Sequence, residues 1–274
     1  MVDLPIDFHD KTNRNTYASR IADTSWRDTM RSLLDARGLR VADIGCGGGI
    51  YSRAWIELGA RSVIGVDSSS VMVEAAREHS SDYPALSFII GDAAATGLTQ
   101  GSVDVVFARA LIHHLKDLDA FTSEARRILT HGGWLIIQDR TPEDVNLPGS
   151  PQHVRGYFFE RFPRLLDAER SRRWTTEDVA SAMRRVGFTT IGTVTFWETR
   201  RRYGSFNELA EDLRARTGRS ILHDLNEEEL RDSISFIEQK VAGNERIIET
   251  DRWTVWHSIA VRRSSMTRHL RPPE

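Results

Sequence analysis

The strongest chemical signal in the sequence is a glycine-rich segment that runs Asp43-Ile44-Gly45-Cys46-Gly47-Gly48-Gly49. It lies between a short apolar run and a segment of helical period, so it is predicted to form a strand-to-helix turn. Glycines at such a turn let the backbone approach a ligand closely and leave the helix N–H groups pointing at it. Because glycines also form tight turns without any ligand, this segment alone does not establish binding.

Two carboxylates follow at the ends of the next two predicted strands. Asp67 comes 20 residues after Gly47, where a carboxylate can accept hydrogen bonds from ribose hydroxyls. Asp92, in Gly91-Asp92-Ala93, could accept one from an adenine amino group. Each acid alone is equally well explained as a helix cap or turn residue. Together with the glycines, at successive strand ends, they predict a nucleoside pocket at the carboxyl edge of a parallel sheet.

Two adjacent histidines, His113 and His114, follow the fourth predicted strand. The unperturbed pKa of histidine, near 6.5, suits this side chain to take a proton at neutral pH. The alternative is that one or both pack or hydrogen-bond locally near a helix start. We expect no metal site, because neighbouring positions rarely converge on one ion and no acidic partner is evident nearby.

Three charged residues lie at the same predicted edge: Arg109 after the fourth strand, and Asp139 and Arg140 at the end of the fifth. Either arginine could pair with an anionic substrate group. A surface or helix-end arginine is an equally good explanation, since 34 of the 37 basic residues are arginine. Asp139 is more typical of a cap or turn.

The elements that would position these residues alternate between short apolar runs and helical segments. Such alternation predicts a doubly wound α/β architecture, and the weak polar alternation within the runs is typical of parallel strands buried on both faces. The predicted strands are residues 40–44, 62–66, 86–90, 103–108 and 133–137, with helices over 50–58, 70–78 and 118–129.

The flanking segments are more varied. Residues 17–36 are predicted to form one or two helices, and residues 141–150 a loop. The aromatic and basic segment 152–173 favours either a lid over substrate or an amphipathic helix with packed aromatics and solvated arginines. The run 200–202 could touch phosphates or form a solvated turn. Further helices are predicted over 175–186, 206–216 and 227–241, and strands over 189–199 and 253–261.

Composition limits the class of protein. The 274 residues are 40% hydrophobic and 28% charged, and this length fits either one large domain or a domain with a substantial insertion. The net charge of −2 excludes the global basic field of a general nucleic-acid binder, although residues 150–219 carry 14 basic and 9 acidic residues. The single cysteine excludes an intramolecular disulfide and a multi-cysteine zinc site. With no long apolar stretch and no signal peptide pattern, we expect a soluble, cytoplasmic protein.

The glycine pattern distinguishes between cofactors. The nicotinamide fingerprint G-x-G-x-x-G is not met from Gly45, because Ile50 stands at the third glycine position. The pattern Asp-x-Gly-x-Gly-x-Gly instead resembles the class I S-adenosylmethionine-dependent methyltransferases, similar to the methyltransferase type 11 group. The resemblance covers about residues 38–140 and, more weakly, 174–188. Its other landmarks are Val66-Asp67-Ser68 with Met72, Gly91-Asp92-Ala93, Asp104-Val105-Val106-Phe107 and His113-His114-Leu115-x-Asp117.

The resemblance implies a Rossmann-like, mostly parallel sheet of seven strands whose last strand is antiparallel, with helical insertions after strands 5 and 6. It implies one domain over 1–274, made of an N-terminal helical cap (1–37), a cofactor-binding core (38–140) and substrate-side insertions (141–174 and 200–250). The implied cofactor is S-adenosylmethionine, with S-adenosylhomocysteine as its product.

The resemblance also assigns residues to the ligand. Asp43 would orient the loop and the ligand's ammonium, and Tyr17 or Arg20 would lie near its carboxylate, although a core aromatic and a surface arginine are equally good explanations. Arg109 is a further cofactor-binding candidate. His114 is the favoured general base, with His113 second. The remaining implied contacts are Gly45, Cys46, Gly47 and Gly49 with the methionine part, Asp67 and Ser68 with the ribose, and Met72, Asp92 and Ala93 with the adenine.

The acceptor is expected to be a small molecule. The sequence has no Asn/Asp-Pro-Pro-aromatic motif after the fourth strand, as amino methylation of nucleic-acid bases would need, and its only cysteine lies in the glycine segment. An RNA or tRNA methyltransferase that uses the basic segment 150–219 is the alternative enzyme. A non-catalytic protein that binds S-adenosylmethionine is the alternative from another class. The sequence does not predict the oligomeric state.

Overall fold

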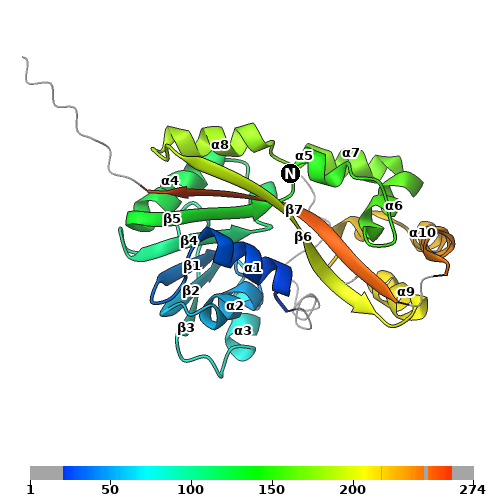
Figure 1. The fold of residues 1–274 in the computed structure, drawn as a ribbon, viewed down its shortest axis with the longest axis horizontal. Helices are drawn as coiled ribbons and strands as arrows, with labels where there is room; N and C mark the ends of the chain where they lie inside the picture. The colour runs from blue at the N-terminus through cyan, green and yellow to red at the C-terminus, as the bar shows by residue number, and fades with distance from the viewer. Residues whose placement is uncertain (1–20, 217, 244–245, 261–274) are drawn as a thin grey trace, which may run out of the picture.

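The computed structural model describes residues 21–216, 218–243 and 246–260, and its centre is a seven-stranded sheet (Figure 1). The strand order is β3-β2-β1-β4-β5-β7-β6, in which β7 runs antiparallel to both of its neighbours and the other pairs are parallel. This confirms the predicted doubly wound, mostly parallel sheet. The strands are β1 (Arg40–Ile44), β2 (Ser62–Asp67), β3 (Leu86–Ile90), β4 (Val103–Arg109), β5 (Leu129–Asp139), β6 (Ile191–Tyr203) and β7 (Ile247–Ile259).

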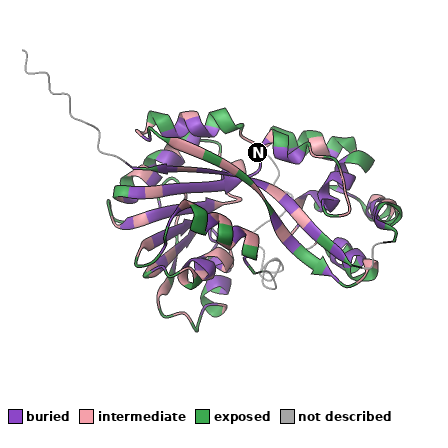
Figure 2. Ribbon diagram, in the orientation of Figure 1, coloured by how far each residue is buried: buried purple, intermediate pink, exposed green. Residues whose placement is uncertain are grey.

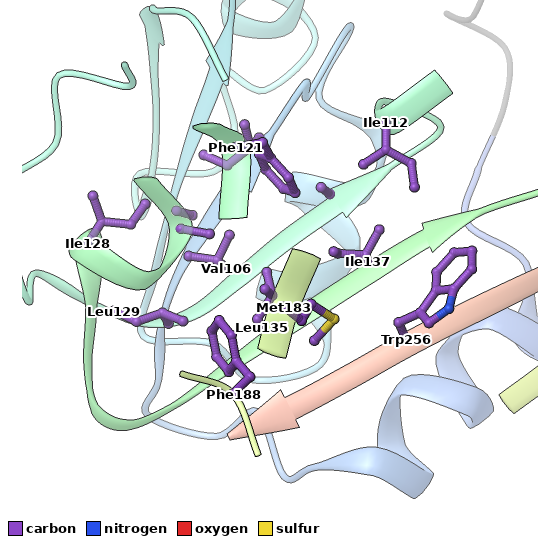
Figure 3. Packing of buried hydrophobic residues seen from close by; sticks show 14 of the residues in the cluster. Val106, Ile112, Phe121, Ile128, Leu129, Leu135, Ile137, Met183, Phe188 and Trp256 are labelled. Atoms are coloured by element: carbon purple, nitrogen blue, oxygen red, sulfur yellow. The ribbon is translucent and has the colours of Figure 1, made fainter. Parts of the chain in front are cut away.

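Helices cover both faces of the sheet. On one face α1 (Thr24–Leu33) and α2 (Ile50–Glu57) contribute Trp26 and Trp55 to a core shared with β1, β4 and β5. On the other face α4 (Leu118–Ile128) and α8 (Thr176–Arg185) pack Phe121 and Met183 against the same strands (Figure 3). α3 (Ser70–Glu78) packs against β2 and β3. The strands between these layers are largely buried (Figure 2), which explains their lack of polar alternation.

Local sequence signals account for most helix boundaries. Ser69 and Asp117 cap α3 and α4, each accepting a backbone N–H in the first turn, and Thr175 forms a capping box with Asp178 at α8. The loop predicted over residues 141–150 is wrong at its start, where α5 (Pro142–Val145) forms. Thr141 caps this short helix and proline occupies its first position, a placement that favours helix initiation.

A helical lobe with its own core is carried by β6 and β7, which continue as a two-stranded ribbon beyond β5 (Figure 1). Its aromatic members include Tyr157, Phe158 and Phe159, all buried, so the aromatics of segment 152–173 pack in a core as predicted, but residues 154–159 are buried on every side rather than forming an amphipathic helix. The prediction of solvated arginines there is wrong for Arg155 and Arg173, which are buried. The lobe contains α6 (Val154–Arg161), α7 (Pro163–Ser171), α9 (Phe206–Arg214), η3 (Ser220–Asp224) and α10 (Glu227–Val241).

A buried ionic cluster fastens the end of the ribbon to this lobe. Arg200 and Arg219 each contact the carboxylates of Asp212 and Glu249 at 2.6–3.0 Å. The hydroxyl of Tyr203 donates to Asp212 at 2.7 Å. The turn considered for residues 200–202 is wrong, because the run belongs to β6. Arg200 is buried in the lobe, whereas Arg201 and Arg202 are exposed as the solvated alternative predicts. In the part of the chain that the structure describes, no helix has the length and apolar character that crossing a bilayer requires.

Candidate functional site

The glycine loop between β1 and α2 has three residues in the left-handed region, with φ of 73° at Gly45, 49° at Gly47 and 75° at Gly49. A Cβ at Gly45 would lie 2.8 Å from Leu111, and one at Gly49 would lie 3.0 Å from Phe88, so close packing explains why glycine stands at these two positions. A Cβ at Gly47 would meet no atom within 4 Å. The loop therefore presents open space at Gly47, where a ligand can approach the backbone.

Asp67 holds this loop in place from the end of β2. Its carboxylate accepts the N–H of Gly47 at 2.9 Å and the N–H of Ser69 at 2.9 Å. A carboxylate has about four lone-pair positions, so hydroxyl donors can be added to the two backbone bonds. Ser68, the next residue, is exposed. The structure thus brings Asp67 and the glycine loop together, as the spacing of 20 residues predicts.

The side chains of Asp43 and Cys46 lie beneath the loop. Asp43 is buried and accepts the hydroxyl of Ser52 at 2.5 Å. Burial raises the pKa of Asp43 to about 7, since no cation neutralises it directly. The Cys46 thiol packs in a small apolar cluster with Val73 and Phe88, where burial raises its pKa well above the usual value. Both residues support the loop through its underside.

The residues expected around the adenine are close to the sheet edge. Met72 is buried on α3, while Asp92 is exposed after β3 and accepts the N–H of Ala94 at 2.7 Å, which closes its own turn. Ala93 is half-buried and packs against the main core. Tyr17 and Arg20, expected near the ligand carboxylate, lie outside the described residues.

The two histidines lie in the 3-10 helix η2 (Ile112–His114), which follows β4. Ile112 anchors this turn in the main core (Figure 3), and its carbonyl accepts the indole N–H of Trp174 at 2.9 Å. The ring centroids of His113 and His114 lie 3.9 Å apart. Burial lowers the pKa of both, that of His114 to about 3, so both imidazoles are neutral at pH 7.

Asp139 at the end of β5 is the partner of His113. The Nδ1 atom of His113 lies 2.9 Å from Asp139 Oδ2, and Asp139 also accepts from Arg173 Nη1 and from the N–H of Arg140, each at 2.8 Å. Asp139 is buried, and its contacts with His113, Arg173 and the N–H of Arg140 hold its pKa below the usual range despite that burial. This pair was not predicted, because Asp139 is 26 residues from His113 and no local pattern connects the two.

Arg109 is a junction between the sheet and the ribbon. Its Nη2 donates to Glu198 at 2.7 Å, and its guanidinium lies 4.2 Å from the ring centroids of both Tyr51 and Trp253. Glu198 also accepts from Gln138 at 3.1 Å. These contacts direct the guanidinium toward α2, β6 and β7, and they give Arg109 a role that the cofactor assignment did not anticipate.

Other features of the described residues are separate from this edge. A surface pocket of about 210 Å³ lies between α4 and α8, lined among others by Lys116, Asp117 and Trp174, and no glycine-loop residue lines it. Within the described ranges no group of three or more His, Cys, Asp or Glu side chains is placed to hold a metal ion.

Comparison with known proteins assigns the core. Residues 42–137 match a family model described as a methyltransferase domain. Over 108 residues the chain is 33% identical to a ubiquinone biosynthesis O-methyltransferase of Chelativorans sp., an alignment that covers 39% of this chain and 42% of that protein. The chain spans less than half the length of the curated relatives it matches, between 37% and 49% for the first three.

Two solved structures show how far the fold extends. A protein from an antibiotic biosynthesis pathway of Anabaena variabilis has a TM-score of 0.67 at 19% identity, covering 86% of this chain and 98% of that one. The phosphoethanolamine N-methyltransferase 2 of Haemonchus contortus, solved with phosphomonomethylethanolamine and S-adenosylhomocysteine, has a TM-score of 0.60 at 20% identity, covering 94% and 61%. These likenesses show that the fold is the Rossmann-like fold of the methyltransferases. The family match shows that residues 42–137 of this chain form a methyltransferase domain.

Proposed function

We propose that this protein transfers a methyl group from S-adenosylmethionine to a small-molecule acceptor. The observation that carries the proposal is the joint geometry of Gly47 and Asp67. The carboxylate fixes the loop through the Gly47 N–H, while the same glycine leaves open space for a ligand beside it. The methyltransferase-domain match and the O-methyltransferase relatives support both the cofactor and a small acceptor.

The proposed cofactor site follows the sheet edge. The backbone of Gly45, Gly47 and Gly49 would receive the methionine part, and Asp67 with Ser68 would receive the ribose hydroxyls. Asp92, Ala93 and Met72 would contact the adenine. Three further residues would support the loop without contacting the ligand directly. Asp43 would do so through its hydrogen bond with Ser52, and Cys46 through the apolar cluster in which it packs. Arg109 would do so through its contact with the ring of Tyr51. When bound, the cofactor supplies a sulfonium methyl group for in-line displacement, so positioning the nucleophile is the protein's main task.

We place the proton acceptor, for a nucleophile that arrives protonated, on His113 rather than His114. An ionised carboxylate only accepts hydrogen bonds, so Asp139 requires the proton of His113 on Nδ1 and leaves Nε2 as the basic atom. Asp139 also favours the charged imidazole after proton uptake. His114 has a pKa lowered to about 3 by burial and by its neighbour, which makes it the weaker base.

The buried arginines argue against RNA as the acceptor. The basic segment 150–219 would serve as an RNA footprint only if its side chains reached phosphates. Arg155, Arg173, Arg200 and Arg219 of this segment are instead buried in ion pairs. Burial therefore removes four of the fourteen basic side chains of this segment from any surface that could contact RNA.

The test combines binding with methyl transfer. Calorimetry with S-adenosylhomocysteine should show binding that Asp67→Ala weakens at least about tenfold, or 1.4 kcal/mol. As a control, Asp82→Ala removes an exposed carboxylate between α3 and β3 and should leave S-adenosylhomocysteine binding unchanged. The protein is then incubated with methyl-labelled cofactor and cell extract, and label is counted in small-molecule, RNA and protein fractions. Label in RNA would overturn the small-molecule acceptor, and binding without any transfer would favour a non-catalytic protein.

A further inference from the structure

A dense cluster of charged side chains lies at the carboxyl end of β5, beside His113. Its members come from four elements of distant sequence and are largely buried, with side-chain exposures from 1% to 11%. They are Asp139 and Arg140 at the end of β5, Arg155 on α6, Glu169 on α7 with Arg172 and Arg173 after it, and Asp251 on β7.

The cluster holds one positive charge more than its acids neutralise, since four guanidinium groups share three carboxylates. The neighbouring ionic groups cancel internally: Arg109 pairs with Glu198 and Arg252 with Asp144. The cluster at the end of the ribbon likewise pairs two buried arginines, Arg200 and Arg219, with two acids, Asp212 and Glu249. The adjacent His113 has a pKa lowered by burial and adds no charge at pH 7. Arginine keeps its proton in proteins, so the excess charge persists. An uncompensated charge in such a place is destabilising unless an anion joins it.

Arg140 is the least compensated member. Its Nη2 donates to Asp251 at 2.7 Å, but Asp251 is shared with Arg155 Nε at 3.1 Å. The Nε–H of Arg140 is buried and has no acceptor among the described residues. Burial and the repulsion from Arg155 lower its pKa to about 9. Its guanidinium also shares the Trp253 ring with Arg109, at 4.0 and 4.2 Å from the ring centroid.

We propose that the methyl acceptor carries an anionic group, a carboxylate or a phosphate, that binds Arg140 in this cluster. Arg172 and Arg173 each have a further buried Nε–H without an acceptor in the described part of the chain, and they strengthen the positive field. The anion supplies the missing negative charge and places the rest of the acceptor beside His113, whose partner Asp139 also contacts Arg173. This inference rests on the proposed function, because it names the acceptor of that same site.

The test uses the full chain saturated with S-adenosylhomocysteine, with inorganic phosphate and acetate as probes at constant ionic strength. Phosphate should raise the melting temperature of the wild type saturably, by about 3 °C or more at ten times its Kd. Arg140→Gln removes the excess positive charge of the cluster and should raise the half-saturating phosphate concentration at least about tenfold. Arg170→Gln removes an exposed arginine of α7, next to Glu169 of the cluster, and should behave as the wild type. Because phosphate also stabilises proteins by surface exclusion, the difference between these two variants is the result that counts.

Arg140→Lys keeps the charge, and it covers the case in which the glutamine variant fails to fold; it should retain anion stabilisation with weaker affinity. If phosphate and acetate give no saturable stabilisation of the wild type, or if Arg140→Gln responds as Arg170→Gln does, the cluster is purely structural and the inference fails. That failure is distinct from failure of the proposed function, which would appear as absence of S-adenosylhomocysteine binding by calorimetry.

A second readout identifies the anion. The labelled small-molecule product should bind an anion-exchange resin at pH 7. Phosphatase treatment should release the label from the resin if the group is a phosphate ester and should leave it bound if the group is a carboxylate. A labelled product that passes through the resin untreated would overturn the inference.

Discussion

Replacing Gly47 by alanine separates the conformational role of this glycine from its role beside a ligand. Alanine at a φ of 49° costs about 1–2 kcal/mol, because the left-handed region crowds Cβ against the carbonyl oxygen. The added methyl group meets no protein atom within 4 Å, so no further loss of stability is expected. For a chain of this size the melting temperature should fall by about 2–8 °C.

Gly38 provides the matched control. It has a φ of 76° and likewise no atom within 4 Å of a built Cβ, but it lies before β1 begins, at the opposite end of that strand from the glycine loop. Gly38→Ala should therefore lose a similar amount of stability. Only Gly47→Ala places a methyl group where the cofactor is proposed to lie, and a methyl group forced into a close contact costs about 1–3 kcal/mol.

The assay is calorimetric titration of both variants with S-adenosylhomocysteine, alongside thermal melts without ligand. Gly47→Ala should weaken binding by about five- to 150-fold, whereas Gly38→Ala should bind as the wild type does. Equal dissociation constants for the two variants, with equal melting temperatures, would refute the argument that the open space at Gly47 receives the cofactor.

Three further predictions concern charged groups of the same edge. Burial raises the pKa of Asp43 to about 7 in the fold, so its protonated form stabilises the protein fully below about pH 4 and this stabilisation is lost as the pH rises through 7. The melting temperature of Asp43→Asn relative to wild type should therefore increase from pH 5 to pH 8, and a constant difference would contradict the assignment. His113→Gln should lower kcat by about 10²–10⁴ with little change in S-adenosylhomocysteine affinity. Because burial lowers the pKa of His113, the rate of the wild-type enzyme should stay constant from pH 7 down to pH 6. A rate that falls with an apparent pKa near 6.5 would argue against His113 as the base. Glu198→Gln should destabilise the fold by about 3–5 kcal/mol because it leaves Arg109 buried without its carboxylate, and in Arg109→Met the same change should cost much less.

The cofactor core was predictable because its signals are local. Strands β1 and β3 and helices α3 and α10 have the bounds that apolar runs, caps and helical period indicated. The position of Asp67 followed from the spacing of strand ends, which a parallel sheet brings to one edge. Neither inference needed knowledge of contacts between distant segments.

The lobe and its ion pairs were not predictable in the same way. A run of arginines has the same local sequence pattern whether its side chains are solvated or buried. Whether an arginine is buried depends on the carboxylate that it pairs with, which lies far away in the sequence. For Arg200 the partners Asp212 and Glu249 lie 12 and 49 residues away, and for Arg140 the partner Asp251 lies 111 residues away. Such pairings depend on how β7 is registered against β5 and β6 and on where α9 packs, which a single sequence does not specify.

The junction at Arg109 connects the two parts of the molecule. Tyr51 lies in the first turn of α2, directly after the glycine loop, and its hydroxyl donates to Glu198 on the ribbon that carries the helical lobe. Arg109, at the end of β4, contacts the same carboxylate and the ring of Trp253 on β7. Arg140 lies on that ring as well, and it belongs to the cluster proposed to hold the acceptor. One continuous set of contacts therefore joins the loop proposed for the cofactor to the arginine proposed for the acceptor. In-line transfer requires the two ligands to be held in fixed relation, and this junction supplies a rigid connection between their sites.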